Sequence, residues 1–300
     1  MHLTVGIFGD MELIKKLGKQ GTVNDIALYN HGSSDGVFTF AGPNSPDNRI
    51  QPVLQILSMI DVPVVSGPVT KELAEQMIAI DSFGFPHGFL VAPSEDMRNL
   101  IKGTSLERFE ILPDERELRE RLKSVRAKPV TERVWLPIDN YFMVKSVGTV
   151  ILAVNRGCPV KKHEKLFVQP LGKEVLVKGI QSQDKDIEEV EECMRAGINL
   201  KGVDTEELKR GFVLCKEASV SKSVRVRFQK SRFSKEAPEK GVQYYLSLGL
   251  QVIAGKIESV SGDELTLTLE QPAVFYPGQK CMLASTKPAM PRILGSGILL

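Results

Sequence analysis

The sequence predicts an α/β domain with a parallel sheet, followed by two antiparallel β-barrels. Two observations lead to this fold class. Over residues 1–130, short apolar runs alternate with stretches whose apolar residues recur at helical spacing, which is typical of strands and helices built around a parallel sheet. Over residues 131–300, short runs rich in valine, isoleucine and phenylalanine are separated by glycine and proline turns, which is typical of barrels and sandwiches.

In the first domain, residues 1–130, strands and helices are predicted in regular alternation. We expect strands at residues 3–9, 37–40, 62–65 and 87–91, and helices at residues 51–60, 71–80 and 113–125. In the last of these helices, Glu117 and Arg121 are four residues apart and therefore share one face, where they can pair. A charged stretch over residues 119–133 closes the domain and includes a linker at residues 127–129.

The two barrels are predicted at residues 131–217 and 218–300. In the first barrel we expect strands at residues 142–144, 149–154, 165–168 and 174–180. In the second we expect strands at residues 224–228, 242–253, 255–260, 264–269 and 280–284. Residues 184–192 carry a run of acidic side chains, which predicts a solvated loop or helix face.

Composition limits the function classes. A length of 300 residues fits two or three domains, and a net charge of +2 is too small to predict nucleic-acid binding without a local basic patch. The four cysteines form no C-x-x-C pair, which argues against a zinc site and a disulfide framework and fits a reducing compartment. No apolar run is long enough to cross a membrane. We therefore expect a cytoplasmic protein that binds neither DNA nor membranes, and the oligomeric state stays open.

The start of the chain resembles a strand that feeds a phosphate-binding loop. Its apolar run ends in Gly9, after which a working loop would continue through four residues to Gly-Lys-Ser/Thr. Lys15 stands at the lysine position, but Ile14 replaces the glycine and Lys16 replaces the hydroxyl residue. Such glycines let backbone N–H groups wrap the phosphates, and the hydroxyl holds Mg²⁺. We therefore expect no bound GTP or Mg²⁺, no other metal and no GTPase activity.

The first barrel carries a specific set of residues. Leu136-Pro137-Ile138 precedes Phe142, and Gly148-Thr149-Val150 and Arg156-Gly157 follow. This order resembles the second domain of elongation factor Tu and its relatives. The ending, residues 288–299, is similar to the close of the third domain in the archaeal-type selenocysteine-specific elongation factor, where an R-I-x-G-x-G strand completes the barrel. Residues 70–86 are similar to part of the GTPase domain. The resemblance implies a P-loop GTPase-like domain followed by two elongation-factor barrels.

The sequence departs from this family at the nucleotide motifs. The T/N-K-x-D motif, which recognises guanine in the family, corresponds to residues 92–95, Ala-Pro-Ser-Glu. The D-x-P-G-H segment corresponds to residues 40–44, where Phe40 replaces the aspartate and Asn44 stands near the histidine. Thr22 is a relic of the magnesium-binding threonine or an ordinary turn residue. Residues 195–199 occupy the region that contributes an arginine to the aminoacyl pocket in selenocysteine factors, without a clear equivalent here.

The resemblance and these departures together imply a degenerate paralogue. Its expected role is to bind tRNA or a ribosomal or other translation component without GTP hydrolysis, with Gly9, Lys15 and Thr22 as relics of the nucleotide site. Two alternatives stay open. The first is a functional GTPase with an unusual site, and the second is a protein-interaction scaffold.

The densest basic stretch lies at the start of the third domain. Arg225 and Arg227 alternate with valines and therefore share one strand face, and Lys230 and Arg232 follow. In the related factors the third domain contacts tRNA mostly through phosphates, which gives affinity that depends on salt and not on base sequence. These four residues are the candidate RNA contacts. The alternative is an edge strand that its charges keep soluble.

Overall fold

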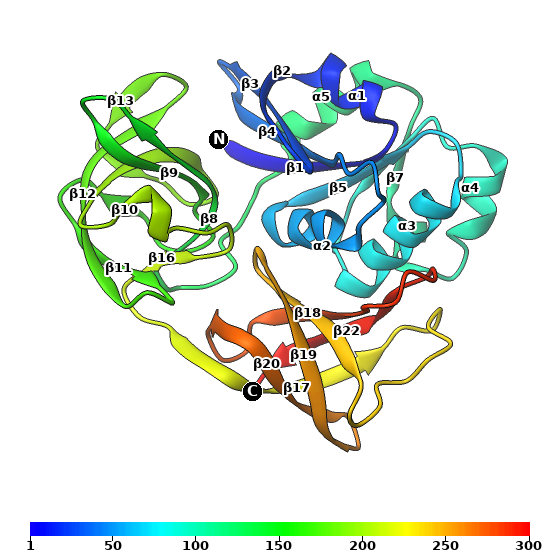
Figure 1. Ribbon diagram of the computed structural model, residues 1–300. Helices are drawn as coiled ribbons and strands as arrows, with labels where there is room; N and C mark the ends of the chain where they lie inside the picture. Colours follow the sequence, from blue (N-terminus) through cyan, green and yellow to red (C-terminus); the bar gives the residue numbers. More distant parts are fainter.

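The computed structural model describes all 300 residues and confirms the predicted fold class, an α/β domain followed by two antiparallel β-barrels (Figure 1). The first domain contains the strands β1 (His2–Gly9), β2 (Lys19–Val23), β3 (Ile26–Ser33), β4 (Gly36–Pro43), β5 (Val62–Ser66), β6 (Phe89–Val91) and β7 (Glu110–Leu112). Its helices are α1 (Met11–Leu17), α2 (Ile50–Met59), α3 (Lys71–Phe83), α4 (Glu95–Leu100), the 3₁₀ helix η1 (Ser105–Arg108) and α5 (Glu115–Ser124). None of these helices has the length and apolar character needed to span a membrane.

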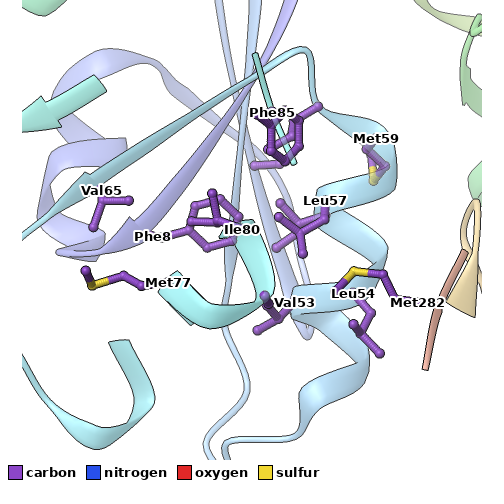
Figure 2. Packing of buried hydrophobic residues seen from close by; sticks show 14 of the residues in the cluster. Phe8, Val53, Leu54, Leu57, Met59, Val65, Met77, Ile80, Phe85 and Met282 are labelled. Carbon is purple, nitrogen blue, oxygen red and sulfur yellow. The ribbon is translucent and has the colours of Figure 1, made fainter. Parts of the chain in front are cut away.

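The sheet of the first domain has the order β2-β3-β4-β1-β5-β6-β7. Strands β4, β1, β5, β6 and β7 are parallel, and helices cover both faces. Helices α2 and α3 pack on one face together with Phe8 and Val65, as Figure 2 shows. Helices α1 and α5 pack on the other face against Val5 and Ile7. Because both faces are covered, β1 is an almost continuous apolar run, as the sequence predicted.

Strands β2 and β3 were not predicted, and they make the sheet mixed and not purely parallel. Both run antiparallel to their neighbours. Strand β2 is exposed or half-buried throughout, so its residues show no apolar alternation that would indicate a strand. The pair extends the sheet at the edge that lies next to the second domain.

The second domain is a closed barrel in which β11 pairs with both β12 and β16. Its elements are β8 (Trp135–Val144), β9 (Gly148–Val154), β10 (Val160–Lys161), β11 (Lys165–Gln169), β12 (Lys173–Ser182), β13 (Lys185–Ile187), β14 (Glu189–Val190), β15 (Arg195–Lys201), the 3₁₀ helix η2 (Thr205–Glu207) and β16 (Val213–Cys215). The acidic run at residues 184–192 lies in β13, β14 and their turns. The prediction of a loop or helix was therefore wrong in its secondary structure, although most of these side chains are exposed.

The third domain is a second closed barrel, in which β17 pairs with β20 and β22. Its strands are β17 (Ser219–Lys230), β18 (Gln243–Leu248), β19 (Gln251–Ser261), β20 (Glu264–Phe275), β21 (Lys280–Ser285) and β22 (Ile293–Leu299).

The three domains share interfaces that are partly apolar. The cluster around α2 and α3 includes Met282 and Ile293 from the third domain, and Figure 2 shows Met282 beside Leu54. Trp135 of the second domain meets Tyr276 of the third edge to face, with ring centroids 4.9 Å apart. The domains are therefore packed against one another and not merely linked.

Ion pairs cross the same interfaces. Arg156 Nη1 of the second domain lies 2.6 Å from Asp61 Oδ1 of the first, and both side chains are buried. Arg292 Nε of the third domain donates to Glu75 Oε1 of α3 at 3.1 Å. Arg210 Nη1 of the second domain donates to Asp25 of the β2–β3 turn at 2.6 Å. Each barrel is thus held to the first domain by charged groups as well as by apolar packing.

Candidate functional site

The connection between β1 and α1, where a phosphate loop would lie, is a single residue. Strand β1 ends at Gly9 and α1 begins at Met11, so only Asp10 lies between them. Asp10 Oδ1 accepts a hydrogen bond from the N–H of Glu12 at 2.9 Å, and the N–H of Asp10 donates to Ser66 O at 3.1 Å. A phosphate loop offers its free N–H groups to the ligand. In this protein the carboxylate of Asp10 accepts a hydrogen bond at the start of α1, where the phosphate would bind.

Gly9 is required by the close approach of two strand ends. Its φ is +95°, and a Cβ atom at this position would lie 2.0 Å from the backbone oxygen of Ser66. A side chain would therefore clash with β5 whether or not a nucleotide binds. Gly9 was predicted as a relic of the nucleotide site, but the contact between β1 and β5 also requires glycine at this position.

Replacing Gly9 by alanine is expected to lower the free energy of unfolding by about 2–4 kcal/mol, because left-handed backbone strain and overpacking add. The matched control is Gly262→Ala, where φ is +61° but no atom lies within 4 Å of the added Cβ. That control is expected to lose about 1–2 kcal/mol. Urea unfolding of both variants measures the difference. Equal losses would show that contact with Ser66 is not the reason for glycine at this position.

Lys15 and Thr22 lie apart from each other and from Gly9. Lys15 is on the exposed side of α1, where its Nζ is 2.6 Å from Glu12 Oε1, and the hydrogen bond to Glu12 raises the pKa of Lys15. Thr22 lies in β2, three strands from β1, which corresponds to about 14 Å at the usual strand spacing. The structure therefore does not bring the three relic residues together into one site.

The other positions that replace nucleotide motifs have structural roles. Phe40 lies in β4 and is buried in the apolar cluster below α1 and α5. Asn44 Nδ2 donates to Asn24 O at 2.7 Å, which fixes the end of the β3–β4 hairpin. Ser94 caps α4 by accepting the N–H of Met97 at 3.2 Å. The segment that would recognise guanine is thus an ordinary helix start.

A crevice with a volume of about 570 Å³ lies between the first and second domains. Asn30 and Thr39 line it from the first domain, and strands of the barrel form the other wall. The barrel contributes apolar side chains, among them Phe142 and Val147, which are 41% and 44% exposed. It also contributes Asp184 and Asp186. The crevice is therefore lined by apolar, amide and acidic side chains.

Arg195, in the region that implied an aminoacyl pocket, lines this crevice but is already paired. Its Nε and Nη2 donate to the two carboxylate oxygens of Asp139 at 2.9 and 2.7 Å. Asn199 lies on the same strand, and its Oδ1 is buried without a hydrogen-bond partner. The sequence pointed to residues 195–199 but could not show the crevice, which forms only when β4 and β12 come together.

The candidate RNA contacts lie on and just after β17. Arg225 and Arg227 are exposed while Val224 and Val226 are buried, so the side chains alternate as expected. Lys230 ends the strand and is exposed, and Arg232 lies over the ring of Phe233, 4.6 Å from its centroid. The patch is not purely basic, because the Arg227 guanidinium lies 3.8 Å from Glu264 and 3.9 Å from Asp263. No group of three or more histidine, cysteine or carboxylate side chains is arranged to hold a metal ion.

Comparison with known proteins identifies relatives of this chain. No family model matches the chain. A protein of Methanocaldococcus jannaschii, described as uncharacterized, is 36% identical over 99% of both chains. The selenocysteine-specific elongation factor of the same organism is 26% identical over 88% of this chain and 56% of its own length. The elongation factor 1-alpha of Metallosphaera sedula is 28% identical over 48% of this chain.

The solved structures that resemble this chain are also elongation factors. The translation elongation factor SelB of Methanococcus maripaludis, in complex with a GTP analogue, matches with a TM-score of 0.84 over 99% of this chain and 78% of its own, at 18% identity. A bacterial selenocysteine-specific elongation factor matches with a TM-score of 0.81 over 99% of this chain and 58% of its own, at 19% identity. The chain is homologous to translation elongation factors of the selenocysteine-specific and 1-alpha type.

Like the SelB structure, this chain has one α/β domain and two barrels. It spans 56% of the length of the selenocysteine-specific factor that it matches. The positions that differ from the expected nucleotide motifs are local, namely the one-residue connection after Gly9 and residues 40–44 and 92–95.

Proposed function

We propose that this protein is a cytoplasmic, elongation-factor-like protein that binds tRNA or another component of translation and does not hydrolyse GTP. The translation role is supported by the similarity to elongation factors over most of the chain. The observation that carries the absence of hydrolysis is the single-residue connection at Asp10, whose carboxylate holds the first turn of α1. A triphosphate would meet this carboxylate where it needs N–H donors.

The missing contacts are sufficient to abolish useful GTP affinity. Charge-assisted hydrogen bonds contribute roughly 1.5–3 kcal/mol each, and a phosphate loop normally supplies several of them as well as the Mg²⁺ site. Asp10 and Glu12 add negative charge at the same place. GTP would therefore form fewer favourable contacts with the protein, and the two carboxylates would repel it.

Calorimetric titration of the protein with GTP and Mg²⁺ is expected to show no binding at micromolar concentrations. The matched variant is Lys15→Met, which removes the one relic side chain that could hold a phosphate. A dissociation constant in the micromolar range or tighter that is lost in this variant would favour the alternative, a functional GTPase with an unusual site.

The crevice between the first two domains supports binding of an aminoacylated RNA end. The amino group of an aminoacyl ester donates hydrogen bonds and carries positive charge when protonated. Asp184 and Asp186 offer acceptors of the matching kind. The apolar side chains of Phe142 and Val147 suit a side chain or a base. The volume of the crevice, about 570 Å³, is in the range of small-molecule sites, roughly 300–1,000 Å³.

Filter binding with tRNA tests this function directly. We expect saturable binding of tRNA that is tighter for aminoacylated than for deacylated tRNA, because only the former fills the crevice. Absence of tRNA binding would favour the scaffold alternative. One observation fits that alternative: the β8–β9 hairpin exposes several large apolar side chains, namely Phe142, Met143 and Val147.

A further inference from the structure

A second large cavity, with a volume of about 480 Å³, lies where the three domains meet. It is separate from both the relic loop and the crevice described above. The end of α2 and the segment after α3 form its wall in the first domain. The linker and the start of β8 form a second wall, and the turn between β20 and β21 in the third domain closes it.

The cavity has an excess of positive charge. Arg126, Lys128, Arg156 and Lys280 line it, while Asp61 is the one carboxylate among its lining residues. Asp61 is already paired with Arg156. The other three cations form no ion pair with any carboxylate of the chain. Groups of like charge repel one another, so a cavity of this kind gains from a bound anion.

The Arg156 guanidinium has donors that the protein does not use. Its Nη1 donates to Asp61 Oδ1 at 2.6 Å and to Met59 O at 3.3 Å. Its Nε is buried without a partner. Its Nη2 is not among the guanidinium atoms that donate to Met59 or Asp61, which leaves it free for a ligand. Buried polar groups of this kind are costly unless they are satisfied. An oxyanion that reaches Nη2 would satisfy one of these donors.

Lys280 is held at the mouth of the cavity. Its Nζ donates to Phe83 O at 2.6 Å and lies 4.8 Å from the centroid of the Phe83 ring. Although the side chain reaches solvent, the surrounding protein removes part of its hydration, and this desolvation lowers the pKa of Lys280. A neighbouring anion would favour the charged form.

We propose that this cavity binds a small organic phosphate. Lys128, Lys280 and the free Nη2 of Arg156 hold the phosphate, and the carbon part of the ligand lies against Tyr276 and Val130. Phosphate suits this site because several donors from different directions match its several oxygens. Since the walls come from all three domains, the ligand joins the domains to one another. The proposal is independent of RNA binding.

The test uses Trp135, which is the single tryptophan of the chain and lines the cavity. The full-length protein is titrated with inorganic phosphate, ribose 5-phosphate and guanosine 5′-monophosphate while the tryptophan emission is followed. We expect a saturable change with at least one organic phosphate, at lower concentration than with inorganic phosphate. Equal affinity for the two organic phosphates identifies a sugar phosphate as sufficient, and preference for the nucleotide shows that the base also contributes.

Methionine variants locate the ligand, since methionine keeps an apolar stem and removes the charge. Lys128→Met and Lys280→Met together are expected to weaken binding at least about tenfold. The matched control, Lys178→Met with Lys222→Met, changes two exposed lysines away from the cavity and is expected to leave binding unchanged. Circular dichroism checks that each variant is folded, and Lys128→Met alone, in the exposed linker, provides a second measurement. The proposal is overturned if none of the three compounds gives a saturable change, or if only the control pair abolishes it.

Discussion

Replacing Asp61 by alanine is expected to lower the free energy of unfolding by about 3–5 kcal/mol, because it leaves the Arg156 guanidinium buried and unpaired. The two side chains are 4% and 7% exposed, and they join the first domain to the second. Asp61 also accepts the N–H of Thr4 at 2.8 Å, so the variant removes a partner from the backbone of β1 as well.

Equilibrium unfolding in urea measures this loss. Glu174→Ala is the matched control, since Glu174 pairs with Lys165 at 2.9 Å on the exposed surface of the second domain. That pair is expected to contribute less than about 1 kcal/mol. Combining Asp61→Ala with Arg156→Met is expected to recover part of the loss, because the unpaired charge is then absent. If the single and double variants lose stability additively, the two groups are not coupled and our account of the interface is wrong.

Replacing Arg225, Arg227, Lys230 and Arg232 by alanine together is expected to weaken tRNA binding by about a thousandfold at moderate salt. Each phosphate contact contributes roughly 0.7–0.9 to the slope of log K against log salt. Four contacts therefore change the slope by about 3, which corresponds to about three orders of magnitude in affinity near 0.1 M salt. The ion pairs of Arg227 with Glu264 and Asp263 would reduce its share of this effect.

Filter binding at several salt concentrations compares the quadruple variant with the unmodified protein. The control replaces four exposed lysines of the second domain, Lys161, Lys165, Lys173 and Lys178. It removes the same charge from side chains that line neither the crevice nor the basic stretch of β17, so its slope is expected to change much less. If the two quadruple variants bind alike, the basic residues of β17 serve solubility, and the scaffold alternative gains support.

The elements that were predicted correctly are those whose pattern is local. The valines of β17 alternate with arginines, and β1 and β5 are short runs that must be buried on both faces. Helix α5 carries its apolar side chains Leu118 and Leu122 at helical spacing, and Arg121 lies 3.4 Å from Glu117 as expected. In each case a few neighbouring residues decide the structure, so that the sequence alone is sufficient.

The features that were missed depend on residues far apart in the chain. Asp61 and Arg156 are separated by 95 residues, and Glu75 and Arg292 by 217. Their meeting depends on how the domains pack, which no local pattern encodes. The same holds for the crevice and for the cavity around Trp135. Strand β2 was missed for another reason, because an exposed edge strand needs no apolar alternation.

The packing of Met282 and Ile293 against α2 and α3 also bears on how this protein can be regulated. A factor that switches must uncover such contacts whenever its first domain moves relative to its barrels. Each Å² of apolar surface uncovered costs about 25 cal/mol, and a first domain that binds no GTP, as we propose, has no γ-phosphate to supply that energy. We therefore expect binding to be constitutive. Its extent would follow the concentration of the partner, in contrast to the timed release of a GTP-driven cycle.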